Sequence, residues 1–465
     1  MTERIAAKVT GSHTPGSMRE LLHAAIPLMV CSGSQAMMNA ADRAVLAGWS
    51  AEALAAVSPA SMLYWTCVCI PLGVVLYANT LIAQYEGANR PDGMMAAMWQ
   101  AIWLSLFAGC LLPLLMPLTE TLLLASGQLP RVAELQSEYF NTLCGGSSLI
   151  LLSTACSSYF SGRRRTLIVM LVGILAVILN LLLDWVLVFG VGRLEAQGIA
   201  GAAIATLLAR VFEIVVYSTL ILREASRQQV ALFGQWKPQW RYLRTYLRFG
   251  VPSGLHFFVD YSGFAAFLLM IGSIGESELG ATNLAFSVNG LVFVPLLGFG
   301  TAIQTVVGHH VGACRMDAAR GTTRCAVIMG LLWTGLAGLL LVCFPGAALR
   351  PFFLFADVTE EMLQLSADAG LLLRFVAVYS VFDALAVVFA SSLRGAGDTL
   401  FPMLLTMASS WLVMVLPAWL MLVWMTPSLQ QMWLSPTAGI TVAGLLMWLR
   451  YRSGEWMKIR LTEQQ

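Results

Sequence analysis

Charge is scarce in this sequence. Asp, Glu, Lys and Arg make up only 11% of the 465 residues, whereas 58% are hydrophobic. A soluble domain carries roughly 25% charged residues, so the composition excludes an ordinary water-facing surface. It indicates an integral membrane protein with many spans. The formal net charge of +2 gives no reason to expect a nucleic-acid partner.

Several motifs are missing as well. The chain has no Gly-x-x-x-x-Gly-Lys-[Ser/Thr] phosphate loop, no His-Glu-x-x-His and no Gly-x-Ser-x-Gly. These absences exclude direct use of ATP and disfavour a membrane-embedded enzyme, so no cofactor is expected. The nine cysteines show no metal-ligand or disulfide spacing. Residues 1–17 are polar and carry no removable signal peptide, so the first span is its own insertion signal.

Apolar runs long enough to cross a bilayer recur along the whole chain. They lie near 20–47, 57–83, 94–116, 135–159, 165–190, 196–222, 245–274, 281–309, 322–346, 367–392, 399–424 and 432–452. When the N-terminus, every second loop and the C-terminus are assigned to one side of the membrane, most of the 27 Lys and Arg residues fall on that side. By the positive-inside rule both termini are cytoplasmic, and an inner-membrane location is expected.

The two halves of the sequence repeat each other. Pro27 in "ELLHAAIPLMV" matches Pro252 in "TYLRFGVPSGL", 225 residues later, and "SSYFSGRRRTL" matches "SSLRGAGDTL". Six spans per half make these parallel repeats, which suit a rocking transporter. We expect an all-α membrane protein with two pseudo-symmetric six-helix lobes. Its expected segments are a cytoplasmic N-terminal segment (1–19), an N-lobe (20–222), a basic linker (223–244), a C-lobe (245–452) and a cytoplasmic tail (453–465).

Ionisable residues within spans are few, and each costs about 2.5–3.5 kcal/mol on insertion scales. Asn180 and Asp184 lie four residues apart, on one helix face. A carboxylate and an amide oxygen suit a proton or Na⁺, with Asp42 closing the site and Thr206 adding a hydroxyl. The alternative is that Asp184 only hydrogen-bonds a neighbouring helix. Arg43, next to Asp42, is placed to neutralise that acid instead.

The other polar residues in the spans have simpler interpretations. Arg210 and Glu213 are three residues apart and indicate a local ion pair. His256 and Asp260 form either a proton relay or, as we prefer, a plain hydrogen bond. Asp383 stands alone in its span. Gln35 and Tyr139 are candidates for cavity lining, and Pro27 and Pro252 for hinges, because proline bends a helix.

The sequence resembles the multidrug and toxic-compound extrusion (MATE) family of secondary transporters, bacterial type. The likeness runs from Leu21 to Trp424 and is carried by Pro27, "ADRAVLAG", "NLLLDW", "FGVPSGLHFFVD" and "FDALAVVFASSLRGAGDT". The resemblance implies a V-shaped fold of two lobes and export of organic, often cationic, compounds in exchange for Na⁺ or H⁺. It places the cation site at Asp42, Asn180, Asp184 and Thr206, and the C-lobe acids at Asp260 and Asp383. Arg43 departs from the small or uncharged residue expected beside the first-span acid.

The expected function is therefore a cation-coupled antiporter, acting as a monomer on small organic substrates by alternating access. Sodium and protons favour the same oxygen ligands, so the coupling ion stays open. A lipid-linked oligosaccharide flippase of related build is one alternative, but it should line its cavity with several Arg or Lys to bind pyrophosphate. A membrane-embedded enzyme is a less favoured alternative.

Overall fold

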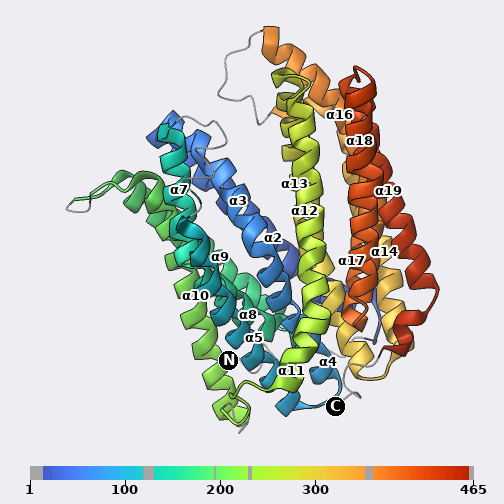
Figure 1. Ribbon diagram of the computed structural model, residues 1–465. Helices are drawn as coiled ribbons and strands as arrows, with labels where there is room; N and C mark the ends of the chain where they lie inside the picture. Colours follow the sequence, from blue (N-terminus) through green and yellow to red (C-terminus); the bar gives the residue numbers. More distant parts are fainter. Residues whose placement is uncertain are drawn as a thin grey trace. The chain divides into compact units, whose positions relative to one another are not determined.

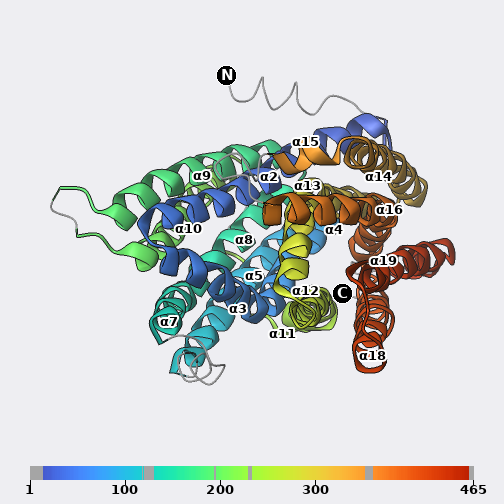
Figure 2. The ribbon, with the colours of Figure 1, turned by 90° about the horizontal axis from the view of Figure 1, so that it is seen from above.

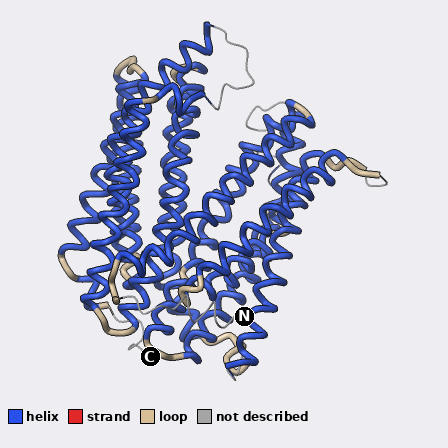
Figure 3. The backbone as a smooth tube through the Cα atoms, turned by 180° about the vertical axis from the view of Figure 1, so that it is seen from behind, coloured by secondary structure: helices blue, strands red, loops and turns tan. Residues whose placement is uncertain are grey.

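The computed structural model describes residues 14–117, 119, 130–192, 195–228, 233–350 and 360–459. Helices joined by short loops make up these residues, and no strand occurs among them (Figure 3). The predicted N-terminal segment, basic linker and tail extend into residues 1–13, 229–232 and 460–465, outside the described part. Among the described residues, 11 helices are long and apolar enough to cross a membrane, or up to 12 if a bent pair counts as one span. The predicted all-α membrane fold is confirmed.

The described residues of the first half form a series of helices, labelled α2 to α11 (Figure 1). They are α2 (Met18–Trp49), α3 (Ala51–Leu76), α4 (Ala78–Gly87), α5 (Pro91–Leu111) with a 3-10 turn (Leu112–Leu115), α7 (Pro130–Gly145), α8 (Ser147–Gly162), α9 (Thr166–Phe189), α10 (Gly198–Gln228) and α11 (Trp240–Thr245). α7 and α8 form the bent pair, with a break of 47°. The break falls at Gly145-Gly146, where glycine tolerates a non-helical backbone.

The second half begins with a π-helical turn (Tyr246–Gly250) and continues as a similar series of helices. They are α12 (Val251–Gly272), α13 (Glu276–Gly312), α14 (Met316–Cys343), α15 (Pro345–Leu349), α16 (Glu360–Ala396), α17 (Leu400–Met407), a second π-helical segment (Ala408–Val415), α18 (Leu416–Trp424), α19 (Leu429–Arg452) and a final 3-10 turn (Glu455–Lys458). Ser428 caps α19 with a capping box, because its hydroxyl accepts from the Gln431 backbone while the Gln431 side chain accepts in return.

The chain divides into two compact units, Val30–Tyr261 and the described residues of Met1–Met29 with Ser262–Gln465. The lobe boundaries at 20–222 and 245–452 remain a prediction. Within the first of these units α9 packs along α10, and α3 packs against α7 (Figure 2). Its core includes Tyr64, Phe140 and Ala202. In the other unit α16 packs against α13, α14 and α19 around Trp433.

The two prolines proposed as hinges lie in different helical contexts. Pro27 is buried inside α2, three residues before the point where that helix passes from one compact unit to the other. Pro252 is the second residue of α12, directly after the π-helical turn Tyr246–Gly250. Proline cannot donate an i→i−4 bond, which explains the altered helical repeat before Pro252. The hinge role of both prolines remains a prediction.

An ion pair recurs with its charges exchanged at matching places of the sequence repeat. In one unit Arg165 Nη1 lies 2.6 Å from Glu224 Oε2, joining the turn before α9 to α10. In the other, Asp398 Oδ2 lies 2.8 Å from Arg450 Nε, joining the turn before α17 to α19. Since Gly162 matches Gly395 and Thr166 matches Thr399, Arg165 and Asp398 occupy equivalent positions. Each half thus ties its fifth span to its sixth by an ion pair of opposite polarity.

Candidate functional site

α9 places Asn180 and Asp184 inside the bundle because its two faces differ in polarity. Leu171, Leu175, Ile178, Leu182 and Trp185 are exposed along one face of α9, as expected of a helix side that meets lipid. The opposite face carries Gly173, Ala176, Asn180 and Asp184, all buried. Helical periodicity therefore turns the only two strongly polar side chains of this span away from lipid.

The structure brings together the four residues expected to form the cation site. Asp42 reaches the site from α2, Asn180 and Asp184 from α9, and Thr206 from α10. Asp42 is 6% exposed, and Asn180 and Asp184 are fully buried. Residues from three helices thus meet at a point shielded from bulk water. The sequence predicted this set of residues, and their use in coupling remains a proposal.

Asn180 bridges the two acids through one amide group. With its amide oriented to match its neighbours, the side-chain nitrogen donates to Asp42 Oδ1 at 3.1 Å and to Asp184 Oδ2 at 3.2 Å. The amide oxygen accepts from the Thr206 backbone N–H at 3.2 Å. The Thr206 hydroxyl instead donates to the Ala202 carbonyl oxygen at 3.2 Å. Thr206 therefore holds Asn180 through its backbone N–H, while its hydroxyl bonds to a carbonyl oxygen of α10 itself.

The carboxyl groups of Asp42 and Asp184 lie close to each other, since one amide nitrogen of Asn180 reaches both. Ionised carboxylates only accept, so each of them can take a hydrogen bond from the Asn180 amide. Two carboxylates that share a site repel each other when both are charged, and burial adds a further penalty. Asp42 and Asp184 therefore form a buried pair of acids bridged by one amide.

Arg43 does not neutralise Asp42 by direct contact. Its side chain is exposed, whereas Asp42 on the next position of α2 is buried. Within the described part of the chain Arg43 forms no ion pair. The reason is helical geometry, because adjacent residues point about 100° apart. The Arg43 guanidinium therefore does not cover the carboxyl group of Asp42.

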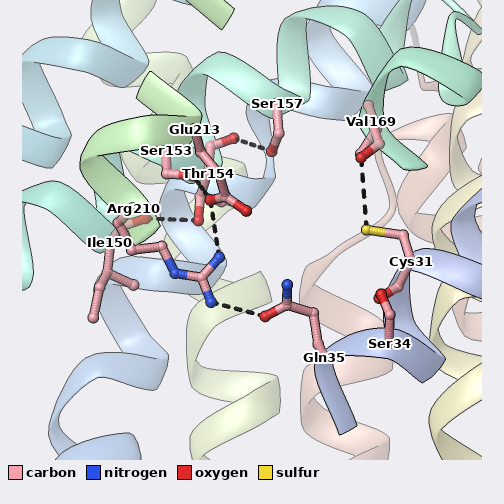
Figure 4. A network of polar contacts seen from close by, with 10 residues as sticks. All are labelled: Cys31, Ser34, Gln35, Ile150, Ser153, Thr154, Ser157, Val169, Arg210 and Glu213. Atoms are coloured by element: carbon pink, nitrogen blue, oxygen red, sulfur yellow. Dashed lines mark hydrogen bonds and ion pairs between the residues drawn. The ribbon is translucent and has the colours of Figure 1, made fainter. Parts of the chain in front are cut away.

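A second polar cluster lies one helical turn beyond Thr206 along α10. Arg210 Nη1 is 2.9 Å from Glu213 Oε2, so the predicted local ion pair is present. Arg210 Nη2 also donates to Gln35 Oε1 of α2 at 2.8 Å, and Ser153 of α8 donates to Glu213 (Figure 4). Gln35 and Asp42 are seven residues apart, which puts them on the same face of α2. Sequence reasoning missed the Gln35 and Ser153 contacts.

Tyr139 and His256 lie in this unit too. Tyr139 on α7 is 7% exposed and lies near the charges of Asp42 and Asp184 and beside Ser61. It packs in the buried apolar cluster with Tyr64 and Phe140. His256 on α12 is half-buried, with its ring edge-on to Phe257. The structure thus places Tyr139 in the apolar core of this unit, while the lining role of both residues remains untested.

The two acids expected in the second half fall in different compact units. Asp260 on α12 belongs to Val30–Tyr261, and Asp383 on α16 belongs to the other unit. Both side chains are half-buried. Asp383 lies near the buried Tyr379 hydroxyl, one turn earlier on α16. Their proposed role as C-lobe acids stays a prediction.

An apolar helical bundle with ionisable groups buried between its spans defines a multi-pass membrane protein of the transporter class. The MatE family model matches residues 27–186 and 252–420. "Probable multidrug resistance protein NorM" of Thermotoga maritima is 26% identical over 445 residues, covering 96% of this chain and 94% of that protein. "Multidrug resistance protein NorM" of Photobacterium profundum is 25% identical, covering 96% and 97%.

The fold agrees with these sequence matches. A solved structure described as the outward-facing conformation of a multidrug resistance MATE family transporter of the MOP superfamily aligns with a TM-score of 0.85. It is 21% identical, covering 94% of this chain and 96% of that one. The chain belongs to the MatE family. It is a membrane transport protein and not an enzyme.

Proposed function

We propose that the protein exports organic compounds, typically cations, in exchange for a coupling cation, by alternating access of the lobes 20–222 and 245–452. Family membership and the multidrug resistance names of the relatives support export of small organic molecules. The observation that carries the coupling is the buried acid pair Asp42–Asp184 bridged by Asn180. Intramembrane acids of this kind mark ion pathways and proton relays in pumps and transporters.

The donor pattern favours H⁺ over Na⁺ as the coupling ion. A sodium site needs several oxygens turned toward one point, yet Asn180 presents its NH₂ group to both carboxylates. Its amide oxygen is engaged by the Thr206 N–H, and the Thr206 hydroxyl donates to Ala202. Asn180 thus turns no oxygen toward the space between the acids, and the two carboxyl groups that its amide bridges are suited to hold a proton. The proposed coupling ion is therefore H⁺, and no cofactor takes part.

Coupling follows from the charge of the acid pair. With two protons the pair is neutral, and with one it carries a single negative charge that Asp42 and Asp184 share. With no proton, the two negatively charged carboxylates repel each other. Asn180 stabilises ionised carboxylates in the pair because its NH₂ group donates to both acids at once. A proton taken up from outside neutralises the pair and weakens its attraction for a cationic substrate, which then leaves. Loss of that proton to the cytoplasm restores the attraction.

The flippase alternative gains no support from the buried arginine of α10. Arg210 is already neutralised by Glu213 and bonded to Gln35, so it offers no free charge for a pyrophosphate.

We place the protein in the cytoplasmic (inner) membrane as a monomer with both termini in the cytoplasm. The orientation is supported by the excess of Lys and Arg on that side.

Efflux of a fluorescent organic cation from pump-deficient cells tests the proposal. Wild type should lower cell fluorescence more strongly when the outside is acidic, and removing external Na⁺ should leave efflux unchanged. Asp184→Asn should abolish the pH response, whereas Asp92→Asn, which removes an exposed acid at the first turn of α5, should not. Efflux by Asp184→Asn with a normal pH response would contradict the role of the acid pair. Efflux that follows Na⁺ would contradict proton coupling.

A further inference from the structure

The segment before α11 is fastened to α5 by hydrogen bonds to its backbone. Gln100 of α5 is 1% exposed; its side-chain nitrogen donates to the Lys237 carbonyl oxygen, and its side-chain oxygen accepts from the Gln239 N–H, both at 3.2 Å. Trp103 Nε1 of the same helix donates to the Trp236 carbonyl oxygen at 2.7 Å. Residues 236–239 therefore follow a fixed path, and their side chains are presented from a fixed backbone.

The helical residues that follow are fastened through their tyrosines. α11 packs against α5, and Tyr246 directly after it is fully buried, with its hydroxyl donating to the Ala97 carbonyl oxygen at 2.7 Å. The ring of Tyr242 lies edge-on to that of Tyr85 on α4, with 6.2 Å between the ring centroids. One side of this segment is thus packed against the helices of its own unit.

The exposed side chains of the same segment are aromatic and cationic. We call them the linker surface, which comprises Phe233, Trp236, Lys237, Trp240, Arg241 and Arg244. Trp240 is 70% exposed and Phe233 62%. Within the described part of the chain none of the three cations forms an ion pair. Residues 233–250 contain no Asp or Glu, so the segment itself offers no counter-charge.

The linker surface lies at the end of a span that is longer than the bilayer core. The candidate span Trp240–Gly272 has 33 residues, which corresponds to about 50 Å of helix, whereas the hydrocarbon core is about 30 Å thick. Arg241, Arg244 and Arg248 keep the first turns of this span out of the core because charge is costly there. These turns therefore lie in the headgroup layer, which tryptophan side chains favour and where Lys and Arg meet lipid phosphates.

We propose that the linker surface binds the headgroup of an anionic phospholipid, which by the predicted orientation belongs to the cytoplasmic leaflet. Arg241 and Arg244 are three residues apart, so they share a helix face and can donate to one phosphate group together with Lys237. A zwitterionic headgroup suits the surface less, because its own ammonium group is repelled by these cations.

An acidic protein segment would also be attracted to the three cations. The exposed rings of Phe233, Trp236 and Trp240 favour a lipid instead, because aromatic side chains beside cations match the apolar and charged zones of a membrane interface. The inference concerns the lipids around the protein and goes beyond the proposed export function.

The test measures lipid binding to the purified full-length protein in a mild detergent. Phosphatidylglycerol, which is anionic, and phosphatidylcholine, which is zwitterionic, are titrated separately, and bound lipid is counted by native mass spectrometry. Wild type should bind phosphatidylglycerol more tightly. Arg241→Gln/Arg244→Gln should weaken phosphatidylglycerol binding about thirtyfold, which corresponds to two contacts of about 1 kcal/mol each, and should leave phosphatidylcholine binding unchanged.

Two further double variants serve as controls. Arg241→Lys/Arg244→Lys keeps both charges and should retain most of the preference for phosphatidylglycerol. Arg223→Gln/Arg227→Gln removes two exposed cations from the last turns of α10, outside the linker surface. It lowers the net charge by the same amount and should leave the affinity for phosphatidylglycerol nearly unchanged.

Three outcomes overturn the assignment. Equal affinity of wild type for the two lipids does so without any variant. An equal loss of affinity in Arg223→Gln/Arg227→Gln means that overall charge, and not the linker surface, attracts the lipid. Tighter binding of polyglutamate than of phosphatidylglycerol assigns the surface to an acidic protein segment. Failure of organic-cation efflux contradicts the proposed function alone, because lipid binding is measured without transport.

Discussion

The side-chain nitrogen of Asn180 lies 3.1 Å from Oδ1 of Asp42, and the same nitrogen reaches Asp184 at 3.2 Å. One neutral amide thus joins acids from α2 and α9 while its oxygen is held by the backbone of α10. This makes Asn180 the residue that fixes the distance between the two carboxyls. One side chain therefore links three helices at this point, and the proposed proton coupling depends on the same residue.

Asn180→Leu should destabilise the protein and weaken proton coupling together. The substitution keeps a similar volume but removes two donors to buried acids and one acceptor for the Thr206 N–H. Leaving buried polar groups unsatisfied costs about 1–3 kcal/mol. Thermal unfolding in detergent, followed by tryptophan fluorescence, should show a lower midpoint. An unchanged midpoint would mean that the amide makes none of these bonds.

Arg210→Met and Glu213→Met should each be strongly destabilising, whereas the double variant should recover most of the loss. Removing one partner of a buried ion pair leaves an uncompensated charge, typically at a cost of about 3–5 kcal/mol. Replacing both partners by apolar residues removes that cost. The unfolding midpoints of the four proteins form a double-mutant cycle. Additive losses would contradict the ion pair as the link between these residues.

Gly254→Ala should disrupt the crossing of α3 and α12. A Cβ at Gly254 would meet the Ile70 carbonyl oxygen at 2.3 Å, and one at Gly73 would meet the Gly254 Cα at 2.4 Å. Overpacking of this kind costs about 1–3 kcal/mol. Gly290→Ala in α13 is the matched control, since a Cβ there meets nothing within 4 Å. We expect the unfolding midpoint to fall for Gly254→Ala and to hold or rise slightly for Gly290→Ala; equal midpoints would refute the close crossing.

The orientation can be tested with Cys314, an exposed cysteine in the turn between α13 and α14. In a variant that retains only this cysteine, a membrane-impermeant maleimide should label inside-out vesicles and leave intact cells unlabelled. Thr426→Cys, exposed between α18 and α19, should show the reverse pattern. Labelling of Cys314 from outside intact cells would invert the predicted topology.

Much of this fold follows from the sequence because a membrane span has a simple physical signature. The predicted span at 165–190 corresponds to α9 (Thr166–Phe189), and most other helices exceed their predicted runs by a few residues. They do so because a helix continues past the apolar core into the polar interface, where hydropathy gives no signal. The break of 47° between α7 and α8 was not predicted, although Gly145-Gly146 marks it.

The candidate site was predictable only in part. Asn180 and Asp184 share a face by helical spacing, whereas Asp42 and Thr206 were proposed as polar groups on other spans, an assignment that the family resemblance also implies. The contact of Gln35 with Arg210 depends on which face of α2 meets α10, and local sequence does not encode that packing. The direction in which the Asn180 amide points depends likewise on its neighbours, so the preference for H⁺ over Na⁺ required the assembled site.

The central claim, that the Asp42–Asp184 pair couples export to proton movement, is tested most directly with purified protein in proteoliposomes. Substrate-driven proton release is recorded with an external pH dye in weakly buffered medium, for wild type, Asp42→Asn, Asp184→Asn and the control Asp92→Asn. Wild type and Asp92→Asn should release protons when substrate is added. Asp42→Asn and Asp184→Asn should bind substrate without releasing protons. Proton release by Asp184→Asn equal to that of wild type would contradict the account.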